Sequence, residues 1–283
     1  MDRIGDFTLT WGESLRWDER RQRLWFVDCA TQALHWLEGG EPPLHTMQLD
    51  SLPTGIALTE GDELIVCLAD GLHVVNAEAG TSTLLDSYPD GMHGRANDAD
   101  ADGSGNLVTG TLNMGPGDGA YWWYSADAGW RLLDDDISNA NGPVVLDVDG
   151  ATTLVFGDTP AEKVYAYPYD GAAGTVGPRR VFGDHAALGS APDGATADRD
   201  GGVWSCALGV GKLARFTGDG LDRTVDVPVT NPSDVCFGGP DLDRLFVVSI
   251  NLDLGGGPPG ERGGQLLALD GVGVGRPAPR FHL

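Results

Sequence analysis

Hydrophobic and polar positions alternate in short blocks along the whole chain. Apolar runs of about five residues follow turns rich in Gly, Asp, Asn and Pro, as expected for strands separated by turns. No segment longer than about ten residues keeps the 3.6-residue apolar period of an amphipathic helix. The pattern therefore predicts an all-β protein.

The apolar runs also repeat at a regular spacing. Six of them follow a polar turn and begin at Leu24, Leu64, Leu107, Leu154, Val203 and Leu245. Their starts are 40, 43, 47, 49 and 42 residues apart, and a second strand-like run follows each one, at 33–38, 71–76, 120–125, 163–169, 212–217 and 265–270. A period in the forties with about four strands per unit is typical of β-propellers. We therefore predict that residues 1–283 form a single six-bladed β-propeller domain.

Charge and hydropathy narrow the class of protein. The chain carries 42 acidic and 18 basic residues, a formal net charge of −24, and this surface repels the phosphates of nucleic acid. No stretch of about 18 consecutive apolar residues predicts a membrane span, so neither nucleic acid nor a membrane is an expected partner. The N-terminus lacks the basic and apolar regions of a signal peptide, and we expect a cytoplasmic protein.

The cysteines carry no recognisable chemical motif. Cys29, Cys67, Cys206 and Cys236 lie far apart in strand-like runs, and no CxxC pair occurs. They are expected to be small buried hydrophobic residues in a reducing compartment. The sequence also lacks the GxSxG, HExxH and P-loop motifs, and its six histidines show no metal-ligand spacing.

An acidic run between Arg95 and Asn106, RANDADADGSGN, resembles the start of a calcium-binding loop. An EF-hand beginning at Asp98 needs a bidentate carboxylate at its twelfth position, which is Thr109, and the flanking segments are strand-like. Asp and Gly are also favoured in tight turns. The DADADG part is therefore predicted to be an acidic hairpin turn that leads into the strand LVTGT.

Four local motifs add a family resemblance to the repeat. They are WGESLRWDERRQRLWFVD (11–28), RANDADADGSGNLVTGT (95–111), ISNANGPVVLDVDG (137–150) and APDGATADRDGGVWSC (191–206). Each alone is a weak signal because NG and PDG are common turn sequences. Together, in order and at blade-related positions, they resemble the SMP-30/gluconolactonase family of regucalcin-like six-bladed propellers over nearly the whole chain.

The resemblance implies a metal site at the propeller axis. By it, Glu13, Asn141 and Asp193 would bind one divalent ion, with Asn139 as the alternative to Asn141 because SNANG holds two asparagines. Two carboxylates and an amide oxygen suit Ca, Mg, Mn, Zn or Fe(II), and the sequence does not choose among them. The alternative interpretation is that these are solvated rim and turn residues.

The resemblance also implies a substrate site. Arg95 and Asn97 correspond to the family's substrate-binding pair, and Asp98 would orient one of them; blade-to-blade hydrogen bonding is the alternative. Some relatives carry an acidic substrate contact shortly after the Gly-Thr strand, which is missing here. Asn113 or Met114 is expected near the mouth of the site instead.

The implied activity is hydrolysis of a sugar lactone (an aldonolactone) to its aldonic acid. The divalent metal would polarise the ester carbonyl, and Asp193, the metal or both would activate water. The alternatives are a phosphotriesterase or aryl esterase on the same site, a metal-binding regulatory protein without catalysis, and an interaction scaffold. The expected partner is a small-molecule sugar lactone, and the protein is expected to be a monomer or small homo-oligomer.

Overall fold

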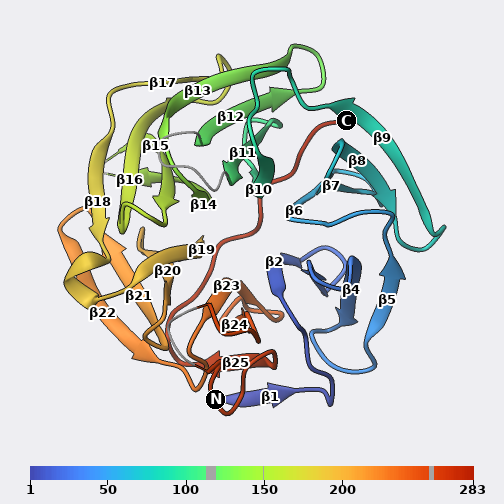
Figure 1. Cartoon of the computed structure of the whole chain (residues 1–283), viewed down its shortest axis with the longest axis vertical. Helices are drawn as coiled ribbons and strands as arrows, with labels where there is room; N and C mark the ends of the chain where they lie inside the picture. The colour runs from blue at the N-terminus through green and yellow to red at the C-terminus, as the bar shows by residue number, and fades with distance from the viewer. Residues whose placement is uncertain (113–118, 149, 255–257) are drawn as a thin grey trace.

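The strands form six antiparallel sheets, arranged as blades around a central axis (Figure 1). The structure is a computed structural model that describes residues 1–112, 119–148, 150–254 and 258–283. The predicted all-β, six-bladed β-propeller is therefore confirmed. The predicted contacts Asn113 and Met114 lie outside the described residues. Across the described ranges, no helix has the length and apolar character needed to cross a membrane.

Each blade begins with the strand nearest the axis, called here its inner strand. Blade one contains β2 (Gly12–Asp18), β3 (Arg23–Asp28), β4 (Ala33–Glu38) and β5 (His45–Gln48). Blade two contains β6 (Gly55–Leu58), β7 (Leu64–Leu68), β8 (Gly71–Asn76) and β9 (Thr81–Ser87). Blade three contains β10 (Arg95–Ala101), β11 (Leu107–Leu112), β12 (Gly119–Ser125) and β13 (Gly129–Ile137).

The second half of the ring follows the same plan with small additions. Blade four contains β14 (Ala140–Val148), β15 (Ala151–Asp158), β16 (Lys163–Asp170), β17 (Thr175–Val176) and β18 (Arg180–Asp184). The 3₁₀ helix η1 (Ala186–Leu188) leads to blade five, with β19 (Ala191–Ala197), β20 (Val203–Leu208), β21 (Lys212–Thr217) and β22 (Gly220–Asp226). Blade six contains β23 (Pro232–Gly238), β24 (Arg244–Ser249), β25 (Leu266–Asp270) and β1 (Asp2–Ile4).

The hydrophobic core lies between the blades. One cluster joins Leu15 and Phe26 of blade one to Phe246 and Val248 of blade six, and comparable clusters fill the other interfaces around the ring. Fully burying a large apolar side chain contributes about 1.5–3 kcal/mol, so each blade is stabilised by its two neighbours. The four predicted buried cysteines are indeed free and buried.

The N-terminal strand closes the ring. β1 pairs with β25, with Asp2 opposite Ala268 and Ile4 opposite Leu266, and so completes blade six from the other end of the sequence. The sequence repeat did not predict this strand, because three residues carry too little apolar pattern to distinguish it from a loop.

The C-terminal segment 275–283, called here the strap, crosses the axis (Figure 1, red). At one end, the Gly275 amide donates to the Leu242 carbonyl at 2.7 Å. At the other, the Phe281 amide donates to the Leu58 carbonyl at 2.8 Å, and the buried Arg280 guanidinium pairs with Asp18 at 2.6 Å. The strap therefore ties blade six to blades one and two across one face of the ring.

The acidic run in blade three forms a turn only at its end. Asp102 accepts hydrogen bonds from the Ser104 and Asn106 amides at 2.8 and 3.0 Å, as a hairpin-turn aspartate does. Asp98 and Asp100, however, belong to the inner strand β10. The prediction that the whole DADADG segment is a turn is therefore wrong for these two residues, because β10 continues to Ala101.

Candidate metal and substrate site

Backbone irregularities mark the start of five inner strands. The strand register breaks after Glu13 in β2, after Ala96 in β10, after Asn141 in β14 and after Pro192 in β19; a fifth break lies in β23. The pairing of β6 with β7 has no break, and no predicted site residue lies on β6. β-Bulges redirect side chains and are common next to functional sites. The predicted site residues lie at or beside these breaks, at the same end of the axis.

Asn97 connects the predicted substrate pair to a predicted metal ligand. Its Nδ2 donates to Asn141 Oδ1 at 2.5 Å and to the Ala140 carbonyl at 3.0 Å. Its Oδ1 accepts from Arg95 Nη1 at 3.0 Å. Both amide protons are therefore used, and one lone pair on Asn97 Oδ1 remains to accept a hydrogen bond from a ligand hydroxyl.

Thr159, which sequence reasoning missed, positions Asn141. Its hydroxyl donates to the Pro192 carbonyl at 2.9 Å and accepts from Asn141 Nδ2 at 2.5 Å. With its amide nitrogen held there, Asn141 turns its Oδ1 toward Asn97. Because Pro192 precedes Asp193, one hydroxyl links the elements that carry two of the predicted ligands.

Asn139, the alternative ligand, lies farther from this network. Its Nδ2 reaches the Thr159 hydroxyl at 3.4 Å, and its Oδ1 is buried without a hydrogen-bond partner. Asn141 is 3% exposed and contacts the neighbouring blade through Asn97. Asn141 therefore has the better-defined amide orientation of the two.

Glu13 is held by a second residue that the motif did not single out. The half-buried Trp11 donates its indole Nε1 proton to Glu13 Oε1 at 2.9 Å. The other oxygen, Oε2, is buried and has no hydrogen-bond partner. The Arg95 guanidinium lies 5.9 Å from the Trp11 ring centre, which brings the two predicted sites together.

Four buried carboxyl groups give this end of the axis a large excess of negative charge. Burial raises the pKa of Glu13 well above its ordinary value, and the charges of Asp98 and Asp234 raise it further. Burial, and then the charge of Glu13, likewise raise the pKa of Asp193. Burial raises the pKa of Asp234 to about 8. Such a cluster favours a bound cation, because the carboxylates destabilise one another without one.

Asp98 and Asp234, which belong to the same cluster, each accept a hydrogen bond from a backbone amide of the next blade. The Asp98 carboxylate accepts from the Gly142 amide at 2.7 Å, whereas none of its hydrogen bonds in the described chain reaches Asn97 or Arg95, which it was expected to orient. Asp234 accepts in the same way from the Leu15 amide, at 2.6 Å, on the next blade. Asp234 could have been predicted from its place in the sequence PSD (232–234), near the start of an inner strand.

The chemistry of these residues fits a hard divalent cation. Glu13 and Asp193 offer carboxylate oxygens, Asn141 offers an amide oxygen, and Glu13 Oε2 is left without a partner. No group of three or more His, Cys, Asp or Glu arranged as a metal centre occurs in the described part of the chain. With only three protein oxygens, such a site leaves coordination positions for water and substrate.

Comparisons with known proteins agree with this architecture. Residues 11–251 match the family described as the SMP-30/gluconolactonase/LRE-like region. The chain is 28% identical to pentonolactonase XacC of Haloferax volcanii, over 98% of this chain and 96% of that protein. It is 31% identical to a 6-deoxy-6-sulfogluconolactonase of Pseudomonas putida, over 84% and 82%. A solved calcium-binding protein, regucalcin of Agrobacterium tumefaciens, superposes with a TM-score of 0.89 at 26% identity, over 100% and 98%.

Proposed function

The chain belongs to the SMP-30/gluconolactonase/LRE-like family, and from that premise we propose that it hydrolyses a sugar lactone to the open-chain sugar acid. The observation that carries the proposal is the convergence of Glu13, Asn141 and Asp193 at one end of the axis, beside Arg95 and Asn97. Two relatives are named as lactonases of five- and six-carbon sugars, which supports this substrate class.

The proposed cofactor is one divalent cation held by Glu13, Asn141 and Asp193. When bound, such a cation supplies Lewis acidity to the ester carbonyl and compensates the negative charge of the carboxylates. Trp11 would hold Glu13 Oε1 so that Oε2 remains available, and Thr159 would hold Asn141 Oδ1 in place. Supporting hydrogen bonds of this kind orient ligands before the metal arrives.

The remaining residues would bind the sugar and move the proton. Arg95 donates to lactone or hydroxyl oxygens, and the free lone pair of Asn97 Oδ1 accepts from a hydroxyl. Asp193 is the proposed base: it removes a proton from the attacking water as the water oxygen bonds to the carbonyl carbon. The ring C–O bond would then break, and its oxygen would take up the proton that Asp193 removed. Burial favours proton uptake by Asp193, whereas a bound cation opposes it.

A calcium-binding role without catalysis is the second candidate. It is favoured by the close superposition on a structure described as a calcium-binding protein. Both functions would use the same metal site, but only the lactonase would turn over a substrate. A phosphotriesterase or aryl esterase activity would use the same oxygen ligands but a different substrate.

The test is a panel of pentono- and hexonolactones, with acid release followed by a pH indicator, in the presence of Ca²⁺, Mg²⁺, Mn²⁺, Zn²⁺ or Fe²⁺. Spontaneous hydrolysis is subtracted, and paraoxon and phenyl acetate test the esterase alternatives. Lactone turnover that EDTA abolishes, and that Asp193→Asn lacks, is the expected result. Tight cation binding without turnover of any lactone would instead support the binding function, and full activity of metal-free Asp193→Asn would exclude the mechanism.

A further inference from the structure

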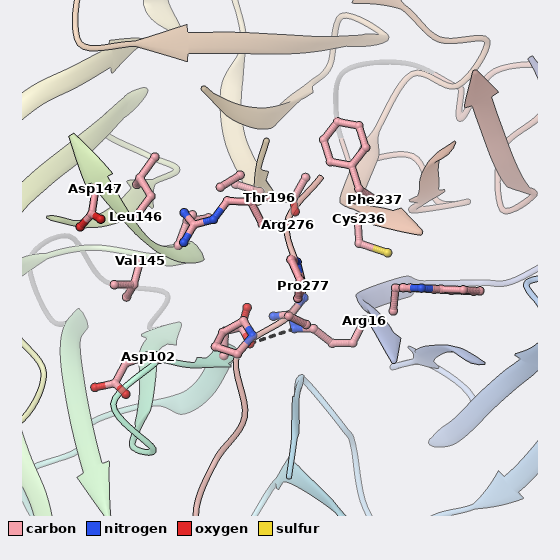
Figure 2. Close-up of a pocket in the computed structure, with 18 of the residues that line it drawn as sticks. Arg16, Asp102, Val145, Leu146, Asp147, Thr196, Cys236, Phe237, Arg276 and Pro277 are labelled. Atoms are coloured by element: carbon pink, nitrogen blue, oxygen red, sulfur yellow. Dashed lines mark ion pairs between the residues drawn. The ribbon is translucent and has the colours of Figure 1, made fainter. Parts of the chain in front are cut away.

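A cavity lies at the other end of the axis from the predicted metal ligands. Its volume is about 310 Å³, and residues 276–279 of the strap form one wall (Figure 2). Arg16 and Asp100 also line it, and each lies three residues beyond a predicted site residue, Glu13 and Asn97. The register breaks of β2 and β10 lie between these residues, and Arg16 Nη1 lies 3.5 Å from Asp234. The strap cavity therefore adjoins the buried carboxyl cluster and opens at the opposite end of the inner strands.

Two arginines line the strap cavity. Arg16 is 7% exposed, and its terminal nitrogens donate to the Leu15 and Ala99 carbonyls and to Asp234. Its Nε lies 3.5 Å from Asp100 as an ion pair and has no hydrogen-bond partner. Arg276 makes no hydrogen bond or ion pair with any residue that the structure describes. Figure 2 shows Arg276 extending from the strap toward Leu146 of β14. Guanidinium groups placed this way bind carboxylates well.

Acceptors and apolar surface complete the lining. Asp100 Oδ1 accepts from the Ala101 amide at 2.8 Å and lies 3.5 Å from Arg16 Nε, which leaves its second oxygen for a ligand. Thr196 also lines the cavity, and its hydroxyl makes no hydrogen bond within the described chain. Phe237 provides an apolar wall. The lining therefore offers guanidinium donors, hydroxyl-binding groups and a surface for a short carbon chain.

The charges of the lining select among anions. Asp100, Asp102 and Asp147 all line the cavity and would repel a doubly charged phosphate, whereas a single carboxylate beside Arg276 leaves Asp100 free to accept from hydroxyl groups. The volume lies at the small end of ligand pockets, which suits a compact molecule.

We propose that the strap cavity binds a small hydroxylated monocarboxylate. The ligand's carboxylate pairs with Arg276, and its hydroxyls bond Asp100 and Thr196. This site goes beyond the proposed lactonase function and does not depend on it, because it uses the opposite ends of the inner strands and the strap.

The test is isothermal titration calorimetry on the full-length, EDTA-treated protein. D-gluconate is the probe, sorbitol tests hydroxyls without a carboxylate, and butyrate tests a carboxylate without hydroxyls. Gluconate is expected to bind at least tenfold more tightly than either. Arg276→Gln should weaken gluconate binding at least tenfold, whereas Arg180→Gln, at an exposed position of β18, should leave it unchanged.

The Asp193→Asn variant distinguishes gluconate binding in the strap cavity from gluconate binding at the proposed active site. Gluconate binding that persists in Asp193→Asn and is lost in Arg276→Gln supports the strap cavity, whatever the lactone panel shows. Absence of gluconate binding, equal affinity in Arg276→Gln, or loss in correctly folded Asp193→Asn would each overturn the proposal. Circular dichroism melts establish that every variant is folded before titration.

Discussion

Thr159→Val is the sharpest test of how the predicted metal ligands are held. Valine has nearly the shape of threonine but lacks the hydroxyl, and the Thr159 amide can still donate to the Asn139 carbonyl at 3.0 Å. The variant loses the bond to the Pro192 carbonyl at 2.9 Å and the bond from Asn141 Nδ2 at 2.5 Å. Asn141 is then free to rotate its amide away from the axis.

The magnitude follows from the buried groups that lose their partner. Asn141 is 3% exposed, and leaving a buried polar group unsatisfied costs about 1–3 kcal/mol in the free energy of unfolding. Loss of a residue that orients a metal ligand typically weakens metal affinity by about 10–100-fold. We therefore expect Thr159→Val to lower both stability and divalent-cation affinity by these amounts.

Calorimetric titration of Ca²⁺ and Mn²⁺ into metal-free protein, together with thermal melts, measures both effects. Thr159→Ser should restore the affinity because it keeps the hydroxyl. Thr153→Val is the matched control: it lies in the same blade, and its buried hydroxyl donates to the Ala151 carbonyl at 3.0 Å, so it should lose stability without losing cation affinity. Wild-type cation affinity in Thr159→Val would refute the reasoning.

Three further substitutions test separate parts of the structure. Glu13→Gln keeps an acceptor for Trp11 and should abolish lactone turnover. At a pH above the raised pKa of Glu13 it also removes one buried charge, so the melting temperature of metal-free protein should rise by about 2–4 °C per ~1 kcal/mol relieved, and a lower melting temperature would contradict this. Burial lowers the pKa of His185 to about 4, below its ordinary 6.5, so the unfolded chain takes up a proton first as the pH falls. Unfolding free energy should therefore fall by about 3 kcal/mol between pH 6.5 and 4, and the difference between wild type and His185→Gln in denaturant melts should show this slope. Arg280→Ala leaves Asp18 without its strap partner and should cost about 3 kcal/mol in the same melts, against about 0–1 for the exposed Arg20→Ala; equal losses would argue against a stabilising strap.

The repeat could be predicted because the second strand of each blade is largely buried between neighbouring blades. β7 is buried at every position and reads as the apolar run LIVCL, so its pattern survives in the sequence. The inner strands are harder to recognise, since β10 reads RANDADA and combines polar site residues with small ones. The strap and β1 carry little apolar pattern, and only the closed ring gives them partners.

The candidate site was predictable only as far as its motifs extend. The residues before the breaks in β2 and β14, Glu13 and Asn141, stand in recognisable motifs. Thr159 acts on the Pro192 carbonyl, 33 residues away in sequence, and only the contact between blades four and five reveals that role. The strap cavity depends in the same way on Arg276 meeting strands from other blades.

The N-terminal strand β1 also constrains the order in which the ring can assemble. β1 is synthesised before β25, its partner, and 262 residues separate Ile4 from Leu266, its register mate. At typical translation rates of roughly 5–20 residues per second, β1 waits about 10–50 s for that partner to be made. Meanwhile the blades can form in succession, each covering one face of the last. The ring becomes circular only when β1 meets β25, so closure of the ring follows the synthesis of blade six.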